Sequence, residues 1–286
     1  MPILYYLVLK PISILPRWAR YLLSDAVSFI LKDIVRYRRT LVETQLKHSF
    51  PGLHRSEHAR LVKGVYANVG DVMIEAIRTF SMKEKDALLG LELTGMDVLQ
   101  ELFNDGRDVI LTGGHFANWE AICWGGHRIP HDVYALYKPL KNNFMDTKVK
   151  SSRSRFGVEM ISVKEYETYM TEEHDVPRLF IFGIDQSPKK SSSFRMEFLN
   201  RETKVFTGPE RLSKRFDMAV VTGRLMRKSR GRYSVGFKLL YENPRYTDDG
   251  VITLSTMKDV EELVLQRPED WLWTHNRWKH SPKPND

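Results

Sequence analysis

The pattern of hydrophobic positions changes near Gly106. Before that point, apolar residues recur at the three- and four-residue spacing of helices, as in the row Leu61, Val65, Val69, Val72 and Ala76. The Phe50-Pro51-Gly52 sequence is typical of a helix end. We therefore expect helices over Tyr37–Phe50, over the apolar row with Ser56 as its N-cap, and over Met82–Gly90.

After Gly106, short apolar runs alternate with helical stretches. The runs expected to form strands are 108–112, Val133–Tyr137, Val158–Val163, Leu179–Ile184, Ala219–Gly223 and Tyr233–Leu240. The expected helices are Phe144–Phe156, Lys164–Glu173, Gly208–Phe216 and Ser255–Gln266. This alternation predicts an α/β fold with a largely parallel central sheet flanked by helices. A ligand site is then expected at the carboxyl ends of the strands.

The N-terminal segment is apolar over residues 1–9 and is then interrupted by Lys10, Arg17 and Arg20. No charge-free run approaches the ~20 residues that a spanning helix needs. No basic region precedes the apolar run, so a signal peptide is a poor fit. Apolar residues at helical spacing, with basic residues between and after them, indicate an interfacial helix: Leu23, Val27, Ile30 and Ile34.

Two other interpretations of this segment stay open. An amphipathic helix can pack on its own domain, and a tilted span that includes Lys10 is possible. We expect residues 1–50 to form a helical, membrane-associating segment and residues 51–286 to form the catalytic domain.

The composition narrows the function only slightly. The net charge of +8 favours anionic partners, such as nucleic acid, anionic lipid or a phosphorylated substrate, without choosing among them. The single cysteine, Cys123, excludes an internal disulfide and fits a reducing compartment. We interpret it as a small buried apolar residue rather than a catalytic group.

The stretch from Thr112 to Glu120 carries the candidate chemistry. His115 follows a predicted strand and the Gly113-Gly114 turn, and Glu120 lies five residues later. On one continuous helix, five residues would turn the two side chains about 140° apart. A loop before the helix allows His115 to fold back over the helix start, with Asn118 as N-cap.

These residue types suit acyl transfer. A neutral imidazole can take a proton from an alcohol, and a carboxylate on its other nitrogen fixes the tautomer. The activated hydroxyl would attack a thioester directly, and the sequence contains no Gly-x-Ser-x-Gly nucleophile elbow. A capped helix beside a buried histidine is the structural alternative.

Three further groups have both functional and structural interpretations. A basic stretch from Lys138 to Arg155, with Asp146 as its acid, suits phosphates or a solvated helix face. The run Arg224–Arg232 could meet lipid head groups or an acidic carrier protein, or form an exposed turn. Trp271, Trp273 and Trp278 could form an interfacial patch, but we favour core packing for the first two.

The motifs together resemble the bacterial lipid A late (secondary) acyltransferases, within the wider lysophospholipid acyltransferase superfamily. These are the lauroyl- and myristoyltransferases of lipopolysaccharide synthesis. The segments that carry the resemblance span nearly the whole chain: Gly113–Glu120, Leu15-Pro16, Tyr37–Arg39, Ser49–Pro51, Tyr137–Pro139, Arg153–Gly157, Asp185–Pro188, Phe206–Pro209, Pro268–His275 and Arg277–Lys279.

The resemblance implies roles for particular residues. His115 would be the general base and Glu120 the carboxylate that orients it. Arg153 and Asp185 match the family's active-site constellation, and we expect both, with Lys138, to bind substrate. No metal and no bound redox cofactor are implied.

The resemblance also implies the partners. The fatty acyl donor would be an acyl carrier protein thioester, with coenzyme A as the alternative carrier. The acceptor would be a hydroxyl of an acylated, phosphorylated glucosamine disaccharide, a lipid A precursor. The enzyme would work on the cytoplasmic face of the bacterial inner membrane, and we expect no nucleic acid partner.

Three rival hypotheses remain at this stage. A related acyltransferase could use another lipid acceptor, such as an aminolipid or a phospholipid. A hydrolase could bind a metal through His115, Glu120 and Asp185, although no tight metal-ligand spacing is present. A non-enzymatic basic module could bind nucleic acid or anionic membrane.

Overall fold

The computed structural model describes residues 1–281 and has an α/β fold. In these residues a seven-stranded sheet has the order β1-β9-β8-β2-β5-β3-β4, and β6 and β7 form a separate two-stranded ribbon. The strands are β1 (Leu91–Thr94), β2 (Val109–Gly113), β3 (Asp132–Tyr137), β4 (Val158–Ser162), β5 (Arg178–Gly183), β6 (Arg195–Phe198), β7 (Arg201–Lys204), β8 (Ala219–Ser229) and β9 (Arg232–Tyr241).

Helices precede, connect and cover these strands. The longer ones are α3 (Arg17–Phe29), α4 (Arg39–Ser49), α5 (Arg55–Arg78), α7 (Met96–Asn104), α8 (Asn143–Ser154), α10 (Gly208–Phe216) and α11 (Val251–Gln266). The short α-helices are α1 (Pro2–Leu4), α2 (Lys10–Ile14), α6 (Glu84–Gly90) and α9 (Tyr166–Thr171). Short 3₁₀ or π turns are η1 (Tyr5–Leu9), η2 (Ile30–Ile34), η3 (Thr79–Ser81), η4 (Trp119–Arg128), η5 (Pro244–Tyr246) and η6 (Pro268–Asp270).

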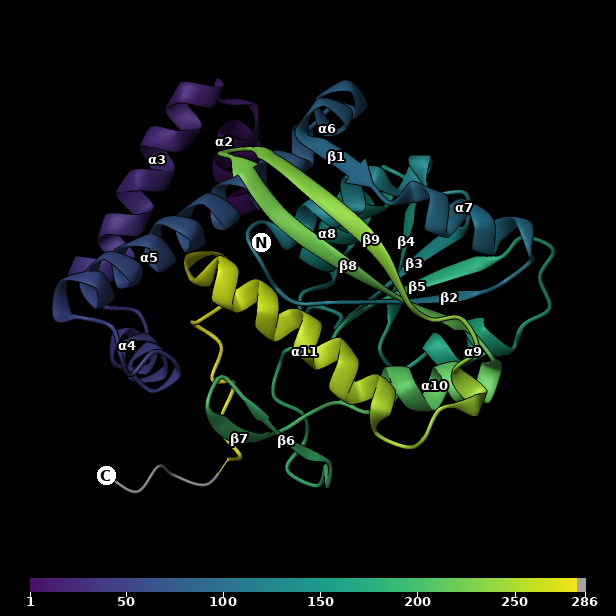
Figure 1. Cartoon of the computed structure of the whole chain (residues 1–286). Helices are drawn as coiled ribbons and strands as arrows, with labels where there is room; N and C mark the ends of the chain where they lie inside the picture. The colour runs from purple at the N-terminus through teal and green to yellow at the C-terminus, as the bar shows by residue number, and fades with distance from the viewer. Residues whose placement is uncertain (282–286) are drawn as a thin grey trace.

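The sheet is largely parallel, as predicted. β2 pairs in parallel with β5 on one side and β8 on the other, and β3 continues the parallel order between β5 and β4. β8 and β9 form an antiparallel hairpin that extends well beyond the end of β2. In Figure 1, α11 crosses in front of the sheet and α8 lies behind it. Both faces of the sheet are thus covered, which explains why β2 is buried along its length.

The N-terminal helices lie to one side of the sheet. α3 runs beside α5, with both at the left in Figure 1. The Ser24 hydroxyl on α3 donates to Asp71 on α5 at 2.6 Å, and Arg230 at the hairpin turn binds the same carboxylate. None of the helices over residues 1–281 combines the length and the apolar character required to cross a bilayer.

Several elements differ from those predicted. The cap of α5 is His54, whose side chain accepts from the Ser56 amide, rather than Ser56 itself. α11 begins four residues before Ser255, because the buried Glu210 carboxylate accepts from the backbone amides of Gly250 at 2.6 Å and Thr253 at 2.9 Å. The stretch after Asn118 is a 3₁₀ helix, and β1, α7, β6 and β7 were not predicted.

Candidate active site

His115 and Asp185 meet at the carboxyl ends of two adjacent strands. Gly113 at the end of β2 is the register partner of Gly183 at the end of β5, so each side chain lies two residues beyond a paired position. The Asp185 carboxylate accepts from the ring Nδ1 of His115 at 2.6 Å and from its backbone amide at 2.7 Å. This is the edge of the sheet at which a ligand site was predicted.

Glycines leave the space that this arrangement needs. A Cβ on Gly183 would lie 2.6 Å from the Cε1 atom of the His115 ring, and a Cβ on Gly114 would lie 2.6 Å from the ring of Phe116. Both contacts are shorter than atoms tolerate. Gly183 at the end of β5 therefore permits the imidazole to lie against the sheet edge, and Gly114 leaves room for the ring of Phe116.

Asp185 is a buried carboxylate with three donors around it. It is 2% exposed, and its Oδ2 also accepts from the indole Nε1 of Trp271 at 2.7 Å. Burial alone would raise the pKa of Asp185, but the charge and hydrogen bonds of His115, together with the indole donor, hold it at about 2. The carboxylate is therefore ionised at neutral pH.

The tautomer of His115 follows from its neighbours. Because a carboxylate only accepts, Nδ1 must carry the proton, and Nε2 of the neutral ring is left as an acceptor. The side-chain amide nitrogen of Gln186, which only donates, lies 3.3 Å from Nε2. Burial lowers the pKa of His115, but the charge and hydrogen bond of Asp185 outweigh it, and the pKa is raised overall.

Glu120 does not hold the imidazole through a hydrogen bond, which corrects the contact predicted from the sequence. Its two oxygens accept from Nε and Nη2 of Arg153 on α8, at 2.6 and 2.5 Å. The carboxylate that orients the ring is Asp185, because β5 is the immediate neighbour of β2 in the sheet. Glu120 still acts on the ring through space, since its charge contributes to the raised pKa of His115.

The loop between His115 and Glu120 is fixed at several points. The Asn118 side chain accepts from the Glu120 amide at 3.1 Å, which confirms its predicted role as N-cap. Its amide nitrogen donates to the buried Glu75 at 2.9 Å. The Ala117 amide donates to the Asp270 carbonyl at 2.7 Å. The ring of Trp119 lies edge-on to His115, with centroids 5.5 Å apart.

The basic stretch from Lys138 to Arg155 does not form one patch. Lys138 follows β3 and is exposed, while Arg153 is engaged by Glu120. Arg155 donates to the carbonyls of Met82 and Phe80, and Lys148 lies over aromatic rings of the N-terminal helices and α8. The phosphate-binding role expected of Arg153 therefore has to compete with a bidentate ion pair inside the protein.

The second basic run is also largely paired. Arg224 binds Asp259 and Glu262, Arg227 binds Asp71, and Arg230 binds Asp71 and Asp25. The run is the β8–β9 hairpin rather than a free turn. Its ion pairs with Asp25 on α3 and Asp71 on α5 attach the N-terminal helices to the sheet.

The C-terminal tryptophans are core residues. Trp271, Trp273 and Trp278 are at most 5% exposed and pack edge-on or stacked on one another, with centroids 4.7 to 6.4 Å apart. This confirms core packing for Trp271 and Trp273, and it contradicts an interfacial patch for Trp278. Cys123 is buried, as interpreted, and burial raises its pKa to about 12.

Sequence reasoning gave no site role to three residues that lie at the site, and it interpreted one of them, His275, as structural. Trp271 donates to Asp185, Gln186 lies at the imidazole, and His275 Nε2 accepts from the Ser187 amide at 3.0 Å. Burial lowers the pKa of His275 to about 4, so it is neutral and able to accept. The order of the motif segments along the chain gave no indication that the C-terminal Trp-Leu-Trp-Thr-His run contacts the 185–187 loop.

The rival hydrolase hypothesis required His115, Glu120 and Asp185 to bind one metal ion. Within the described part of the chain, no three His, Cys, Asp or Glu side chains are grouped so that they could hold a metal ion. Glu120, one of the three ligands considered, is directed at Arg153 instead.

Comparison with known proteins identifies the family of the chain. The model of the bacterial lipid A biosynthesis acyltransferase family matches residues 2–280. The lipid A biosynthesis palmitoleoyltransferase of Escherichia coli (strain K12) is 22% identical over 265 residues, which cover 91% of this chain and 85% of that protein. The lauroyltransferase of the same organism is 22% identical over 275 residues, 94% of this chain and 88% of that protein. The chain therefore belongs to the bacterial lipid A biosynthesis acyltransferases, a family of acyl-transferring enzymes.

Proposed function

We propose that this protein transfers a fatty acyl chain from an acyl thioester, carried by acyl carrier protein, to a hydroxyl of a lipid A precursor. The observation that carries the proposal is the hydrogen bond from His115 Nδ1 to Asp185, which leaves Nε2 as a base at the carboxyl ends of β2 and β5. The family match and the names of the two relatives support the lipid acceptor.

The reaction proceeds by direct attack. The neutral His115 ring takes the proton of the acceptor hydroxyl at Nε2, and the oxygen forms a bond to the thioester carbonyl carbon. The carbon–sulfur bond then breaks, and the thiolate takes the proton back from the imidazolium. Asp185 stabilises the imidazolium between these two steps without itself being protonated.

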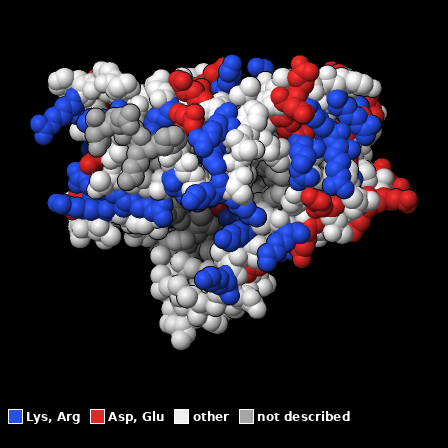
Figure 2. All heavy atoms as spheres, turned by 90° about the horizontal axis from the view of Figure 1, so that it is seen from below, with Lys and Arg blue, Asp and Glu red and all other residues white. Residues whose placement is uncertain are grey.

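The N-terminal segment supports work at a membrane surface, here the cytoplasmic face of the inner membrane. Ile3, Leu7, Trp18, Leu22 and Ile34 are between 64% and 75% exposed, an unusual density of exposed apolar side chains for one short stretch. Figure 2 views the molecule from below and shows a projecting lobe nearly free of charged side chains, with Lys and Arg in several groups on the face above it. Such a surface suits an interfacial helix rather than a spanning one.

The direct test is acyl transfer by the purified protein. Acyl carrier protein and coenzyme A thioesters would be supplied as donors, and a lipid A precursor as acceptor, with products identified by mass. His115→Ala should lower kcat by at least about 10²-fold, as expected for loss of a general base. His127→Ala is the matched control, because His127 is half exposed on η4 and pairs with Glu84.

The outcome separates the proposal from its rival. Competition between the lipid A precursor and aminolipid or phospholipid acceptors would reveal a related acyltransferase with another acceptor. Transfer by a folded His115→Ala protein at the wild-type rate would remove His115 as the base.

A further inference from the structure

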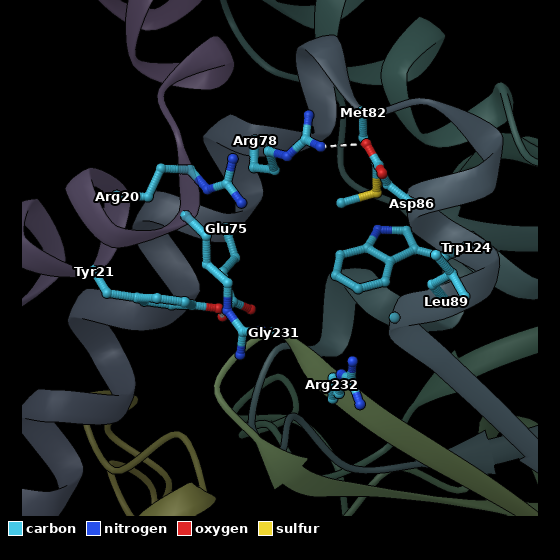
Figure 3. A pocket seen from close by; sticks show the side chains of 12 residues that line it. Arg20, Tyr21, Glu75, Arg78, Met82, Asp86, Leu89, Trp124, Gly231 and Arg232 are labelled. Atoms are coloured by element: carbon cyan, nitrogen blue, oxygen red, sulfur yellow. Dashed lines mark hydrogen bonds and ion pairs between the residues drawn. The ribbon is translucent and has the colours of Figure 1, made fainter.

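A separate cavity lies near the loop that follows His115. It is a pocket of about 200 Å³ between α3, the end of α5, α6, η4 and the turn of the β8–β9 hairpin. In Figure 3, Arg20 and Tyr21 lie on one side, Trp124 lies opposite, Arg232 lies below, and the Arg78–Asp86 ion pair closes the top. Glu75 in its wall accepts from Asn118, so the pocket is connected to the active-site loop.

The pocket contains more positive charge than its acids neutralise. Four arginines line it, and Asp86 is paired with Arg78. Arg17 and Arg20 donate to the main-chain carbonyls of Arg230 and Leu15, each at 2.7 Å. Over residues 1–281, neither of these two nor Arg232 forms an ion pair with a carboxylate. Burial, followed by the charge of Arg78, lowers the pKa of Arg20.

Glu75, the other acid, is engaged elsewhere. It is 4% exposed, and its two oxygens accept from Tyr21 at 3.0 Å, from Asn118 at 2.9 Å and from Tyr233 at 2.5 Å. Its lone pairs are therefore directed at these three donors rather than at the guanidinium groups. Burial, above all, raises the pKa of Glu75, which further weakens it as a counter-charge.

Trp124 forms the wall of the pocket opposite Arg20 and Tyr21. Trp124 is 3% exposed, and its indole Nε1 has no acceptor among the residues that the structure describes. An indole nitrogen only donates, and guanidinium groups only donate. The pocket thus offers donors from Arg17, Arg20 and Arg232 and needs a compact acceptor with several oxygens and negative charge. A phosphate group has this chemistry, and arginine binds it bidentately.

Helix α3 places the pocket beside the exposed apolar surface. Arg17, Arg20 and Tyr21 line the pocket, whereas Trp18 and Leu22, one turn apart on the same helix, are exposed. If this apolar row enters the interface between head groups and acyl chains, the arginines lie at the level of lipid phosphates. The volume of about 200 Å³ is roughly that of seven water molecules at ~30 Å³ each, room for a head group but not for acyl chains.

We propose that this pocket binds the phosphate group of a lipid held at the membrane surface. Only its placement at the membrane rests on the proposed function. The phosphate can belong to the acceptor itself or to an anionic phospholipid of the bilayer.

The first test is the affinity of the full chain for inorganic phosphate, measured by calorimetry. Arg20→Gln and Arg232→Gln should each weaken binding by at least about tenfold, the loss expected from one charge-assisted contact. Lys238→Gln is the matched control, because Lys238 is exposed on β9 and outside the pocket. The Arg232 side chain makes no hydrogen bond within residues 1–281 and lies at the start of β9, so its replacement should not disturb folding. Equal phosphate affinity in the wild type and all three variants would overturn the proposal.

The second test identifies the source of the phosphate. If the acceptor supplies it, Arg232→Gln raises KM for the phosphorylated acceptor and leaves KM for its dephosphorylated form unchanged. If bilayer lipid supplies it, Arg232→Gln weakens binding to phosphatidylcholine vesicles containing phosphatidic acid, but not to phosphatidylcholine alone. If Arg232→Gln changes neither KM for the phosphorylated acceptor nor binding to the phosphatidic acid vesicles, the pocket does not bind a lipid phosphate.

These measurements separate the pocket from the catalytic proposal. His115→Ala should bind inorganic phosphate as the wild type does, since it leaves the pocket intact. Normal phosphate binding by a protein that transfers no acyl group would contradict the proposed function alone. If acyl transfer is normal but phosphate affinity is unchanged in Arg20→Gln and Arg232→Gln, only the proposed phosphate site is contradicted.

Discussion

The Asp185 carboxylate holds His115 at two points, the ring Nδ1 at 2.6 Å and the backbone amide at 2.7 Å. The contact with the backbone amide fixes the position of the His115 main chain. The contact with Nδ1 fixes which ring nitrogen carries the proton. A single buried carboxylate thus sets both the position and the tautomer of His115.

Asp185→Asn is expected to lower kcat by about 10²- to 10⁴-fold. An amide donor facing Nδ1 would favour the tautomer with its proton on Nε2, which cannot act as a base. The pKa of His115 is raised in the wild type, so activity should rise as pH passes through a value above that of free histidine. Without the carboxylate, the acid limb should move to lower pH. A pH–rate profile measures both effects, and a variant profile that overlays the wild type would contradict the assignment.

The sequence identified His115 and Asp185 as site candidates but did not place them in contact. Strand β2, the Gly113-Gly114 turn and His115 follow from local pattern, and the register of β2 with β5 then places Asp185 beside His115. That adjacency depends on the sheet order, which one sequence does not specify. Glu120 was preferred because it is close along the chain, whereas the 3₁₀ turn directs it to Arg153.

The parts of the fold that escaped prediction share physical causes. β1, β6 and β7 have four residues each, too few for alternation to separate strand from loop. The early start of α11 depends on the Glu210 carboxylate from another helix. The Trp271 contact joins residues 86 positions apart. Local pattern holds no information about such tertiary contacts.

Trp271→Phe is expected to destabilise the protein by about 1.5–3 kcal/mol, the usual worth of a hydrogen bond to a charged group. Trp278→Phe is the matched control, because the Trp278 indole is equally buried but has no acceptor within residues 1–281. The low pKa of Asp185 contributes stability that is present above its unfolded value, near 3.8, and lost as pH falls towards about 2. The free energies of unfolding of the two variants, measured in urea between pH 2 and 5, should therefore differ less as the pH falls, because protonation of Asp185 removes the charged acceptor. Equal destabilisation by both substitutions at neutral pH would show that the indole donor is unimportant.

The Glu120–Arg153 pair is expected to behave as one unit. The side chains are 11% and 24% exposed, so removing either leaves a largely buried charge. Glu120→Gln and Arg153→Met should each cost about 2–4 kcal/mol of unfolding free energy, somewhat below fully buried pairs, and the double variant less than their sum. The losses in kcat/KM should likewise be non-additive. Strict additivity in both measurements would argue that the ion pair does not form in solution.

Asp71→Asn is expected to loosen the attachment of the N-terminal helices. Asp71 is 1% exposed and binds Ser24 on α3 together with Arg227 and Arg230 on the β8–β9 hairpin. Replacing it leaves two arginines without their shared counter-charge, at an expected cost of about 3–5 kcal/mol. Asp25→Asn is the control, because Asp25 pairs with the same Arg230 but its side chain is 59% exposed, and its loss should cost at most about 1 kcal/mol. Equilibrium unfolding in urea compares the two, and similar midpoints for both variants would show that burial of Asp71 does not decide the strength of this attachment.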